Sequence, residues 1–166
     1  VHDDASVTVS LAALYQLQDL AVLNLYLNAN IIISDGSTFN IADSPAIYGV
    51  DTGAAIEVTG SGTEMYWFGG NISGVTIRLE DGAFMDWQSG YLIDGCALLI
   101  DSARLSLTTA TTTRYITDSV IHLFGTALLE WYDEGELIMD GDVTIRVFDP
   151  NCTVSIQGEG GSLTRA

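Results

Sequence analysis

The sequence has no lysine and no long hydrophobic run, and each absence argues against a class of protein. Its five basic residues, all arginine, face 22 acidic residues, which leaves a formal net charge of −17. A surface this acidic repels phosphate, so neither nucleic acid nor an anionic membrane is expected as a partner. No apolar stretch approaches the roughly 20 residues of a membrane-spanning helix, because Asn24, Asn28 and Asn30 interrupt the longest candidates.

Cysteine is also scarce. Cys96 and Cys152 are too few for a disulfide framework. The repeat described below sets them two rungs apart on different strands, so they are not expected to pair with each other. The sequence does not decide whether either cysteine forms a disulfide with a neighbouring subunit. No Ser/His/Asp, zinc-ligand or phosphate-loop pattern is present, so we expect no enzyme.

The composition that remains is that of one folded domain spanning 1–166. Hydrophobic residues make up 48% of the chain, and the mean hydropathy is +0.30, which is enough for a sizeable core. The acidic charge, the lack of lysine and the frequent Thr, Ser and Gly favour an extracellular or cell-surface location. The chain opens on Val1, as a processed mature protein would, although a shortened chain would look the same.

A repeat of about 22 residues runs through most of the chain. Short apolar segments followed by turn residues recur at spacings of 22, 21, 23 and 22 residues, and they begin at Val50, Ile72, Ile93, Ile116 and Ile138. Each repeat contains three short stretches with the period-2 alternation of strands, separated by turn residues. First strands are expected at 30–34, 54–59, 75–80, 96–101, 120–124 and 143–148. Second strands are expected at 38–42, 64–68, 83–88, 104–108, 127–132 and 153–157. Third strands are expected at 46–48, 71–72, 91–93, 115–116 and 137–139, with Leu163 beginning a further one.

Stacking the repeats aligns apolar residues in columns. One column of the second strands holds all three tryptophans: Ile41, Trp67, Trp87, Leu107, Trp131 and Ile156. Its neighbour holds Phe39, Met65, Met85, Leu105, Leu129 and Val154. A single rung cannot bury its apolar side, whereas rungs stacked about 4.8 Å apart share one core and one hydrogen-bond ladder.

The columns predict an all-β fold, a right-handed parallel β-helix (β-solenoid) of about six rungs. The hand follows from the general preference of parallel crossovers. A β-sandwich is the alternative, but it does not explain a period of three strands.

The two ends depart from the repeat. Residues 1–27 are expected to form an N-terminal cap, because Ser10, Leu11, Leu14, Leu17 and Ala21 have the spacing of a short capping helix. The alternative is an irregular extra rung. Residues 28–157 would hold the rungs, and 158–166 a C-terminal tail. Since open strand edges attract further strands, either this tail covers the last rung or another chain docks there.

Segments 7–17, 23–27 and 30–36 resemble the start of right-handed parallel β-helix surface proteins of bacteria and archaea, such as adhesin-like and envelope proteins. The resemblance extends over the whole chain as a rhythm rather than as a signature motif. The acidic, lysine-free composition is similar to that expected of sheath or surface-layer subunits, which implies a structural role.

The same fold carries pectate lyases and other polysaccharide-cleaving enzymes, which would imply calcium-binding aspartates beside an Arg or Lys base. Here Arg78 and Arg146 occupy equivalent repeat positions, and His122 matches them, so none is expected to be a catalytic base. The resemblance to these enzymes therefore stops at the fold.

Corner carboxylates are the candidate metal ligands. Calcium prefers oxygen ligands, and carboxylates gather near one corner at Asp81, Asp101 and Asp149 and near another at Asp94, Asp118 and Asp140. The alternative is that aspartate is simply a preferred turn residue. No other cofactor is expected.

Several apolar residues alternate with the inward columns and should therefore face outward. A contiguous patch of this kind usually marks an interface, and the candidates are Tyr66, Phe68, Phe84, Leu99, Leu128 and Tyr132. Asn71 and Asn151 begin Asn-X-Ser/Thr sequons and are candidate glycosylation sites.

These observations predict an extracellular structural protein, a self-assembling subunit of a cell-envelope sheath, surface layer or filament, whose partners are copies of itself. The alternative is a carbohydrate-binding or adhesive module that uses exposed aromatics such as Tyr66 and Tyr132 on a polysaccharide. A polysaccharide lyase or hydrolase is a distant third.

Overall fold

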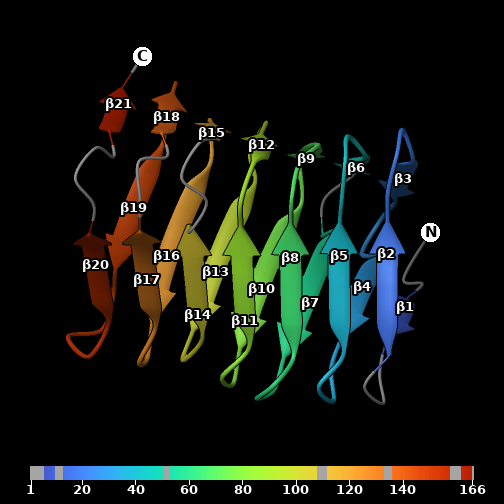
Figure 1. Cartoon of the computed structure of the whole chain (residues 1–166), viewed down its shortest axis with the longest axis horizontal. Coiled ribbons are helices and arrows are strands. Elements are labelled where there is room, and N and C mark those ends of the chain that lie inside the picture. The colour runs from blue at the N-terminus through green and yellow to red at the C-terminus, as the bar shows by residue number, and fades with distance from the viewer. Residues whose placement is uncertain are drawn as a thin grey trace.

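The chain is a parallel β-solenoid. The computed structural model describes residues 6–9, 13–50, 53–107, 112–132, 136–157 and 162–165. Within these ranges all regular secondary structure is β, in 21 short strands. Every third strand belongs to the same sheet, so the chain visits three sheets in turn and then repeats (Figure 1).

Each of the three sheets contains seven described strands. Sheet A consists of β1 (Ser6–Val9), β4 (Asn30–Ile33), β7 (Ala55–Thr59), β10 (Thr76–Glu80), β13 (Ala97–Asp101), β16 (Val120–Phe124) and β19 (Thr144–Val147). Sheet B consists of β2 (Leu14–Leu17), β5 (Thr38–Ile41), β8 (Glu64–Trp67), β11 (Phe84–Trp87), β14 (Arg104–Leu107), β17 (Leu128–Tyr132) and β20 (Thr153–Gln157). Sheet C consists of β3 (Val22–Leu25), β6 (Ala46–Gly49), β9 (Asn71–Ser73), β12 (Gly90–Ile93), β15 (Thr113–Thr117), β18 (Glu136–Asp140) and β21 (Ser162–Arg165).

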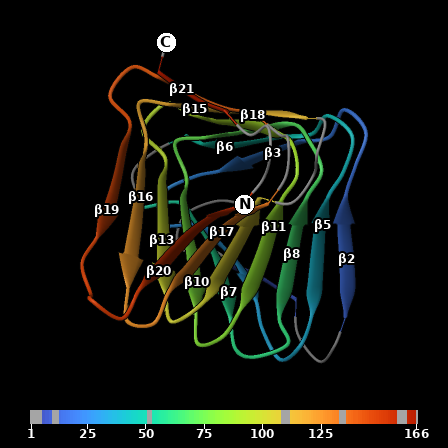
Figure 2. The ribbon, with the colours of Figure 1, turned by 60° about the vertical axis from the view of Figure 1, so that its left-hand side comes forward.

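The coil is right-handed, as predicted. In Figure 1 the strands of sheet B rise on the near side, the chain crosses at the top through sheet C, and it descends behind in sheet A while advancing from right to left. All pairings between neighbouring rungs are parallel, for example β10 with both β7 and β13. Figure 2 shows the three sheets surrounding one interior.

The predicted inward columns are confirmed. Strand register pairs Ile41 with Trp67, Trp67 with Trp87, and Trp131 with both Leu107 and Ile156. The indoles of Trp67 and Trp87 stack with centroids 4.8 Å apart and planes within 8°. Trp131 lies two rungs beyond Trp87, with Leu107 between them, so the tryptophans share a column as the sequence predicts.

Aspartate and glycine turn the corners between the sheets. Nine described residues other than glycine have a positive φ, and six of them are aspartate: Asp19, Asp35, Asp43, Asp81, Asp94 and Asp118. Aspartate tolerates this left-handed conformation better than most residues because its short side chain bonds to nearby backbone. At Gly70 (φ +88°) a Cβ would lie 2.1 Å from the carbonyl oxygen of Pro45 on the previous rung, so only glycine fits that corner.

The predicted N-terminal capping helix is wrong. Residues 14–17 form strand β2, which pairs with β5 from Leu14↔Thr38 to Leu17↔Ile41, while Ser10 and Leu11 lie outside the described residues. The apolar spacing fits a helix, but Tyr15 and Leu17 also alternate as a strand requires, and β5 supplies an edge for that strand to pair with. The backbone N–H of Thr38 donates to the carbonyl of Ala13, at 2.9 Å. Strands β1, β2 and β3 therefore form a rung, which is the alternative to a helical cap.

The C-terminal segment is also more regular than predicted. Ser162–Arg165 form β21, which pairs with β18 and completes the third strand of the last rung. Leu163 was expected to begin such a strand, and 158–166 as a whole was expected to be a C-terminal tail. With β1–β3 and β19–β21 included, each sheet has seven strands where about six rungs were predicted.

Candidate assembly surfaces

The last rung leaves core positions exposed. Ile145 and Val147 of β19 continue the inward columns of sheet A, and Val154 and Ile156 of β20 continue those of sheet B. Their exposed fractions are 38%, 52%, 45% and 68%. The members of the same columns on the middle rungs, from β7 and β8 to β16 and β17, are at most 6% exposed. The coil thus ends in an apolar face that nothing in the described part of the chain covers.

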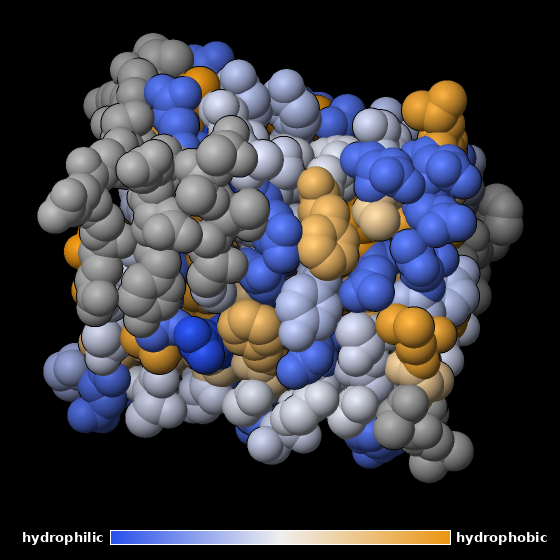
Figure 3. Space-filling model, viewed as in Figure 1, coloured by the Kyte–Doolittle hydropathy of each residue, from blue (hydrophilic) through white to orange (hydrophobic). Residues whose placement is uncertain are grey.

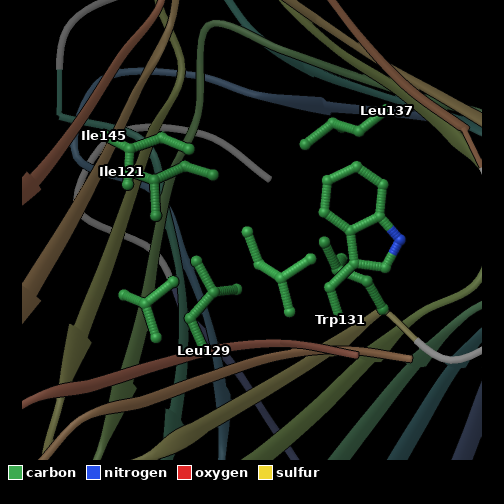
Figure 4. A pocket seen from close by; sticks show the side chains of 8 residues that line it. Ile121, Leu129, Trp131, Leu137 and Ile145 are labelled. Carbon is green, nitrogen blue, oxygen red and sulfur yellow. The ribbon is translucent and has the colours of Figure 1, made fainter. Parts of the chain in front are cut away.

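This face opens into a cavity of about 70 Å³ within the last rungs. Its lining consists only of apolar residues: Leu107, Ile121, Leu129, Trp131, Leu137, Ile145, Val154 and Ile156. Figure 4 shows the indole of Trp131 on one side and Ile121 and Ile145 on the other, with the indole nitrogen on the side away from them. The cavity therefore offers contact with carbon atoms and no hydrogen-bonding group.

The first rung presents a second apolar end. Tyr15 lies in the column of Phe39, and its ring stacks on that of Phe39 with centroids 5.6 Å apart. Its other side is open, and the residue is 43% exposed. Leu17 and Leu23 are partly buried and pack at the edge of the core. The two ends of the coil, formed by β1–β3 and β19–β21, lie at opposite ends of the molecule (Figure 1).

The structure distributes five of the six predicted interface residues over two faces, and the side chain of the sixth, Tyr132, is not described. Tyr66, Phe68 and Phe84 form one aromatic cluster on the outside of sheet B, where the Tyr66 ring lies 6.1 Å from that of Phe68 and 6.0 Å from that of Phe84. Leu128 lies two rungs from Phe84 in the same outward column, with Arg104 on the rung between them. On the face that includes sheet B, Figure 3 shows apolar patches separated by polar side chains.

The remaining two predicted interface residues do not join that cluster in the described structure. Leu99 lies on the outside of sheet A, between Arg78 and His122 in register. The side chain of Tyr132 lies outside the described residues. The described apolar cluster on sheet B is therefore smaller than the predicted patch.

Polar contacts surround the aromatic cluster. The guanidinium of Arg104 lies over the Phe84 ring, 5.2 Å from its centroid, and its Nε donates to Oε2 of Glu130. The Tyr66 hydroxyl donates to Oε2 of Glu64 at 3.0 Å. Burial, followed by this hydrogen bond, raises the pKa of Tyr66 above its ordinary value.

Sheet B also has a buried polar row that was not predicted from the sequence. Asp86, Ser106 and Glu130 share one outward column and are all buried.

Arg114, on β15, is buried in the interior, and its Nε donates to the carbonyl of Trp87 at 2.5 Å. Burial lowers the pKa of Arg114, and the charge of Asp86 opposes that shift. The residue aligned with Arg114 on the previous rung is Gly90, which has no side chain, and this is the one sequence signal for an inward arginine.

The three candidate calcium ligands do not converge. Asp101 aligns with Glu80 on one side and Phe124 on the other, while Asp81 and Asp149 follow the ends of β10 and β19. Asp101 accepts from the Ser102 hydroxyl at 3.0 Å, and Asp149 accepts from the backbone of Asn151 at 2.9 Å. Among the residues that the structure describes, no group of three His, Cys, Asp or Glu side chains is close enough to hold a metal ion.

The carboxylates of the second acidic row, at the corner between sheets C and A, likewise accept hydrogen bonds from hydroxyl or backbone N–H groups. Asp94 accepts from the Ser73 hydroxyl at 3.1 Å, and Asp118 accepts from the backbone N–H of Asp142 at 2.9 Å. Asp140 likewise accepts from the N–H of Gly141. These carboxylates therefore accept hydrogen bonds from residues of the corner that they occupy.

His122 lies where the repeat predicts, between Leu99 and Arg146 in register. Its ring meets Phe124 and Phe148 edge-on at centroid distances of 6.1 and 5.0 Å, and those two phenyl rings stack 4.8 Å apart. His122 Nε2 is buried and has no hydrogen-bond partner. The imidazole therefore serves packing in this structure.

The two sequon asparagines and the two cysteines are the candidate sites of glycosylation and disulfide formation. Asn71 lies on β9, and Asn151 lies in an exposed turn where its Nδ2 donates to Asp149 at 2.9 Å. Cys96 is buried with its Sγ near the carbonyl of Ile93, at 3.2 Å, and burial raises the pKa of its thiol. Cys152 is half-buried on the last rung, and both cysteines are free thiols.

A pair of stacked tyrosines on the outside of sheet C was also missed. Tyr91 and Tyr115 align in register, and their rings lie 4.5 Å apart within 8° of parallel. Tyr91 is exposed. Their spacing of 24 residues, close to the length of the repeat, is the sequence signal for this pair.

These features define the protein as a parallel β-helix with apolar ends. Comparison with known proteins finds no family model, no curated protein and no solved structure that matches the chain. In the described part of the chain, no helix has the length and apolar character needed to cross a membrane.

Proposed function

We propose that this protein is an extracellular structural subunit, without enzymatic activity, that assembles with copies of itself into a cell-envelope sheath, surface layer or filament. The observation that carries this proposal is the exposed apolar face of the last rung, where Ile145, Val147, Val154 and Ile156 continue core columns into solvent. Exposed apolar area of this kind is stabilised when a partner removes it from water. The resemblance to β-helix surface proteins of bacteria and archaea agrees with this role.

The charge of the subunit sets the conditions for assembly. A net charge of −17 makes subunits repel one another, and salt near 0.15 M shortens that repulsion to a Debye length of about 8 Å. Cations of the extracellular medium would therefore promote assembly. Polymer formation should increase with ionic strength, in contrast to an assembly held together by surface ion pairs.

The test compares the full chain with two variants by electron microscopy and sedimentation velocity. Ile156→Glu places a charge on the end face, and Phe68→Glu places the same charge on the aromatic cluster of sheet B; both residues are exposed, so the fold should tolerate either change. We expect ordered polymers from the unmodified chain and fewer from at least one variant. A protein that stays monomeric at all accessible concentrations and salt levels would disprove self-assembly.

A second candidate function is carbohydrate binding by a β-helix adhesive module. The stacked and partly exposed Tyr91–Tyr115 pair favours it, because flat aromatic rings bind the apolar faces of sugars. Tyr66, in contrast, is half-buried and contacts Phe68, Phe84 and Glu64. Glycan-array binding that is lost in Tyr91→Ala, by a chain that remains monomeric, would favour this candidate over assembly.

A further inference from the structure

The inward columns of sheets A and B would continue in register from the last rung of one copy to the first rung of another. At the last rung, the inward positions of sheets A and B are Ile145, Val147, Val154 and Ile156. At the first rung, the same columns begin with Val7 on sheet A and with Tyr15 and Leu17 on sheet B. If a second copy continued the coil, Tyr15 would lie on Val154 and Leu17 on Ile156, as Phe39 lies on Met65 and Ile41 on Trp67 inside the molecule.

The backbone edges at the two ends are complementary as well. Strands β19, β20 and β21 each have one neighbour in their sheets, and so do β1, β2 and β3. All internal pairings are parallel and follow one register. Placing β1, β2 and β3 of a second copy beside β19, β20 and β21 would extend three ladders with the polarity that they already have.

Charge also favours contact between unlike ends. In segment 143–166 the two acidic residues, Asp149 and Glu159, are balanced by Arg146 and Arg165, although the whole chain carries −17. Residues 1–28 contain acidic residues and no basic one. Contact between two first rungs would therefore oppose like acidic charges, whereas contact between a first and a last rung would not.

We infer that the end face of the last rung binds the first rung of a second copy, so that the right-handed coil continues from subunit to subunit in register. This inference rests on the proposed self-assembly and adds its geometry. Because the contact joins two different surfaces, each oligomer keeps one free end of each kind, and repetition gives an open filament. The strand direction of every sheet is then unbroken along the filament.

The column of Cys152 supplies a direct test. This column runs through the residue before each sheet B strand, from Ala13 and Ser37 to Ala127 and Cys152, linked by bonds such as Thr38 N–H to Ala13 O and Thr153 N–H to Ala127 O, both at 2.9 Å. In a continued coil, Ala13 of the second copy would occupy the next place, roughly 4.8 Å from Cys152. That spacing falls within the range of about 4.4–6.8 Å between Cα atoms that a disulfide spans.

The experiment is oxidative cross-linking of full-length Ala13→Cys under conditions that favour assembly. We expect a ladder of disulfide-linked dimers and higher oligomers on non-reducing gels, which disappears on reduction. Ala13 is exposed, so the substitution should leave the circular dichroism and melting of the subunit unchanged. Adding Cys152→Ser should abolish the ladder, whereas the buried Cys96 should not substitute for Cys152.

Gln16→Cys is the matched control. Gln16 is exposed and lies on the same strand, but a continued coil would set it beside Ser155, about three residues and roughly 10 Å from Cys152. We expect its cross-linking to be at least tenfold weaker than that of Ala13→Cys. Equal cross-linking by both variants would overturn the register.

The remaining outcomes separate this inference from the proposed function. Polymers that form normally without the Ala13→Cys ladder would overturn head-to-tail continuation and leave self-assembly standing. Disulfide dimers of the unmodified chain through Cys152 alone would indicate contact between two last rungs and would also overturn it. A chain that remains monomeric in sedimentation, with no ladder, would overturn both.

Discussion

The middle rungs and the terminal rungs use the same columns of apolar residues but bury them to very different extents. Ile77 and Ile145 are both isoleucines and lie in the same column of sheet A. Ile77 is fully buried between Ile56 and Leu98, whereas Ile145 has Ile121 on one side and no described neighbour on the other. In a solenoid, therefore, the sequence of a rung decides which way a side chain points, and only the next rung decides whether it is buried.

The first prediction tests this comparison in its strongest form, with Ile77→Ala and Ile145→Ala. Removing a fully buried isoleucine side chain costs about 2–5 kcal/mol, from lost transfer energy and the cavity left behind. Ile145 is already partly in water, so its substitution should cost less than half as much. Denaturant unfolding at concentrations where the chain is monomeric measures both. Equal losses would mean that something covers the last rung even in the monomer.

The second prediction compares the two thiols. Cys96 is buried on a middle rung with a raised thiol pKa, while Cys152 is half-buried on the last rung. Reaction of Cys96 requires local opening of the structure as well as loss of its proton. We expect a colorimetric thiol reagent to modify Cys152 at least about a hundredfold faster in the native protein, which corresponds to an opening free energy of about 2.7 kcal/mol.

The control for the thiol comparison is the denatured chain. There both cysteines should react at similar rates, and Cys152→Ser should remove only the fast phase from the native profile. If the fast phase survived in Cys152→Ser, Cys96 would be accessible and the middle rungs would open far more readily than their burial indicates.

The middle of the fold could be predicted from the sequence because its signals repeat. The columns of Trp67 and Met65 are each supported by at least five other rungs, so a chance match at one rung matters little. The ends lack this support. In Leu14–Leu17 the helical spacing of Leu14 and Leu17 competes with the strand alternation of Tyr15 and Leu17, and pairing with β5 decides in favour of a strand. Arg114 could not be assigned to the interior, because one glycine at Gly90 is a weak signal for the space that an arginine fills.

The candidate site was predictable only in part for a related reason. The alternation of residues in Glu64–Trp67 correctly places Tyr66 outside, next to Phe68 and Phe84. The aligned repeats also place Arg104 between Phe84 and Leu128, and they place Leu99 on a first strand, on another side of the coil. The continuous patch was therefore predicted too large. The exposed columns of the last rung depend on a missing neighbour, which no pattern within one rung contains.

The third prediction concerns the corners, which the middle and terminal rungs share. Asp81 is exposed and has a φ of 55°. If its role is to turn the backbone, Asp81→Asn should be neutral, while Asp81→Ala should cost about 1 kcal/mol, the penalty of the left-handed region. Unfolding is measured with calcium and with a chelator. A stabilisation by calcium that Asp81→Asn removes would instead support the predicted metal site.

The smallest expected effect tests the outer surface of a middle rung against its interior. Burial and the bond to Glu64 raise the pKa of Tyr66 above the ordinary 10.0, so the folded state holds this proton more tightly than the unfolded chain does. That contribution to stability is complete below pH 10.0 and is lost as pH rises through the folded pKa. Tyr66→Phe should therefore lose less stability than the unmodified chain between neutral and strongly alkaline pH. If both lost the same amount, the Tyr66–Phe68–Phe84 cluster would be open to water, and the outer face of sheet B would be as exposed as the ends.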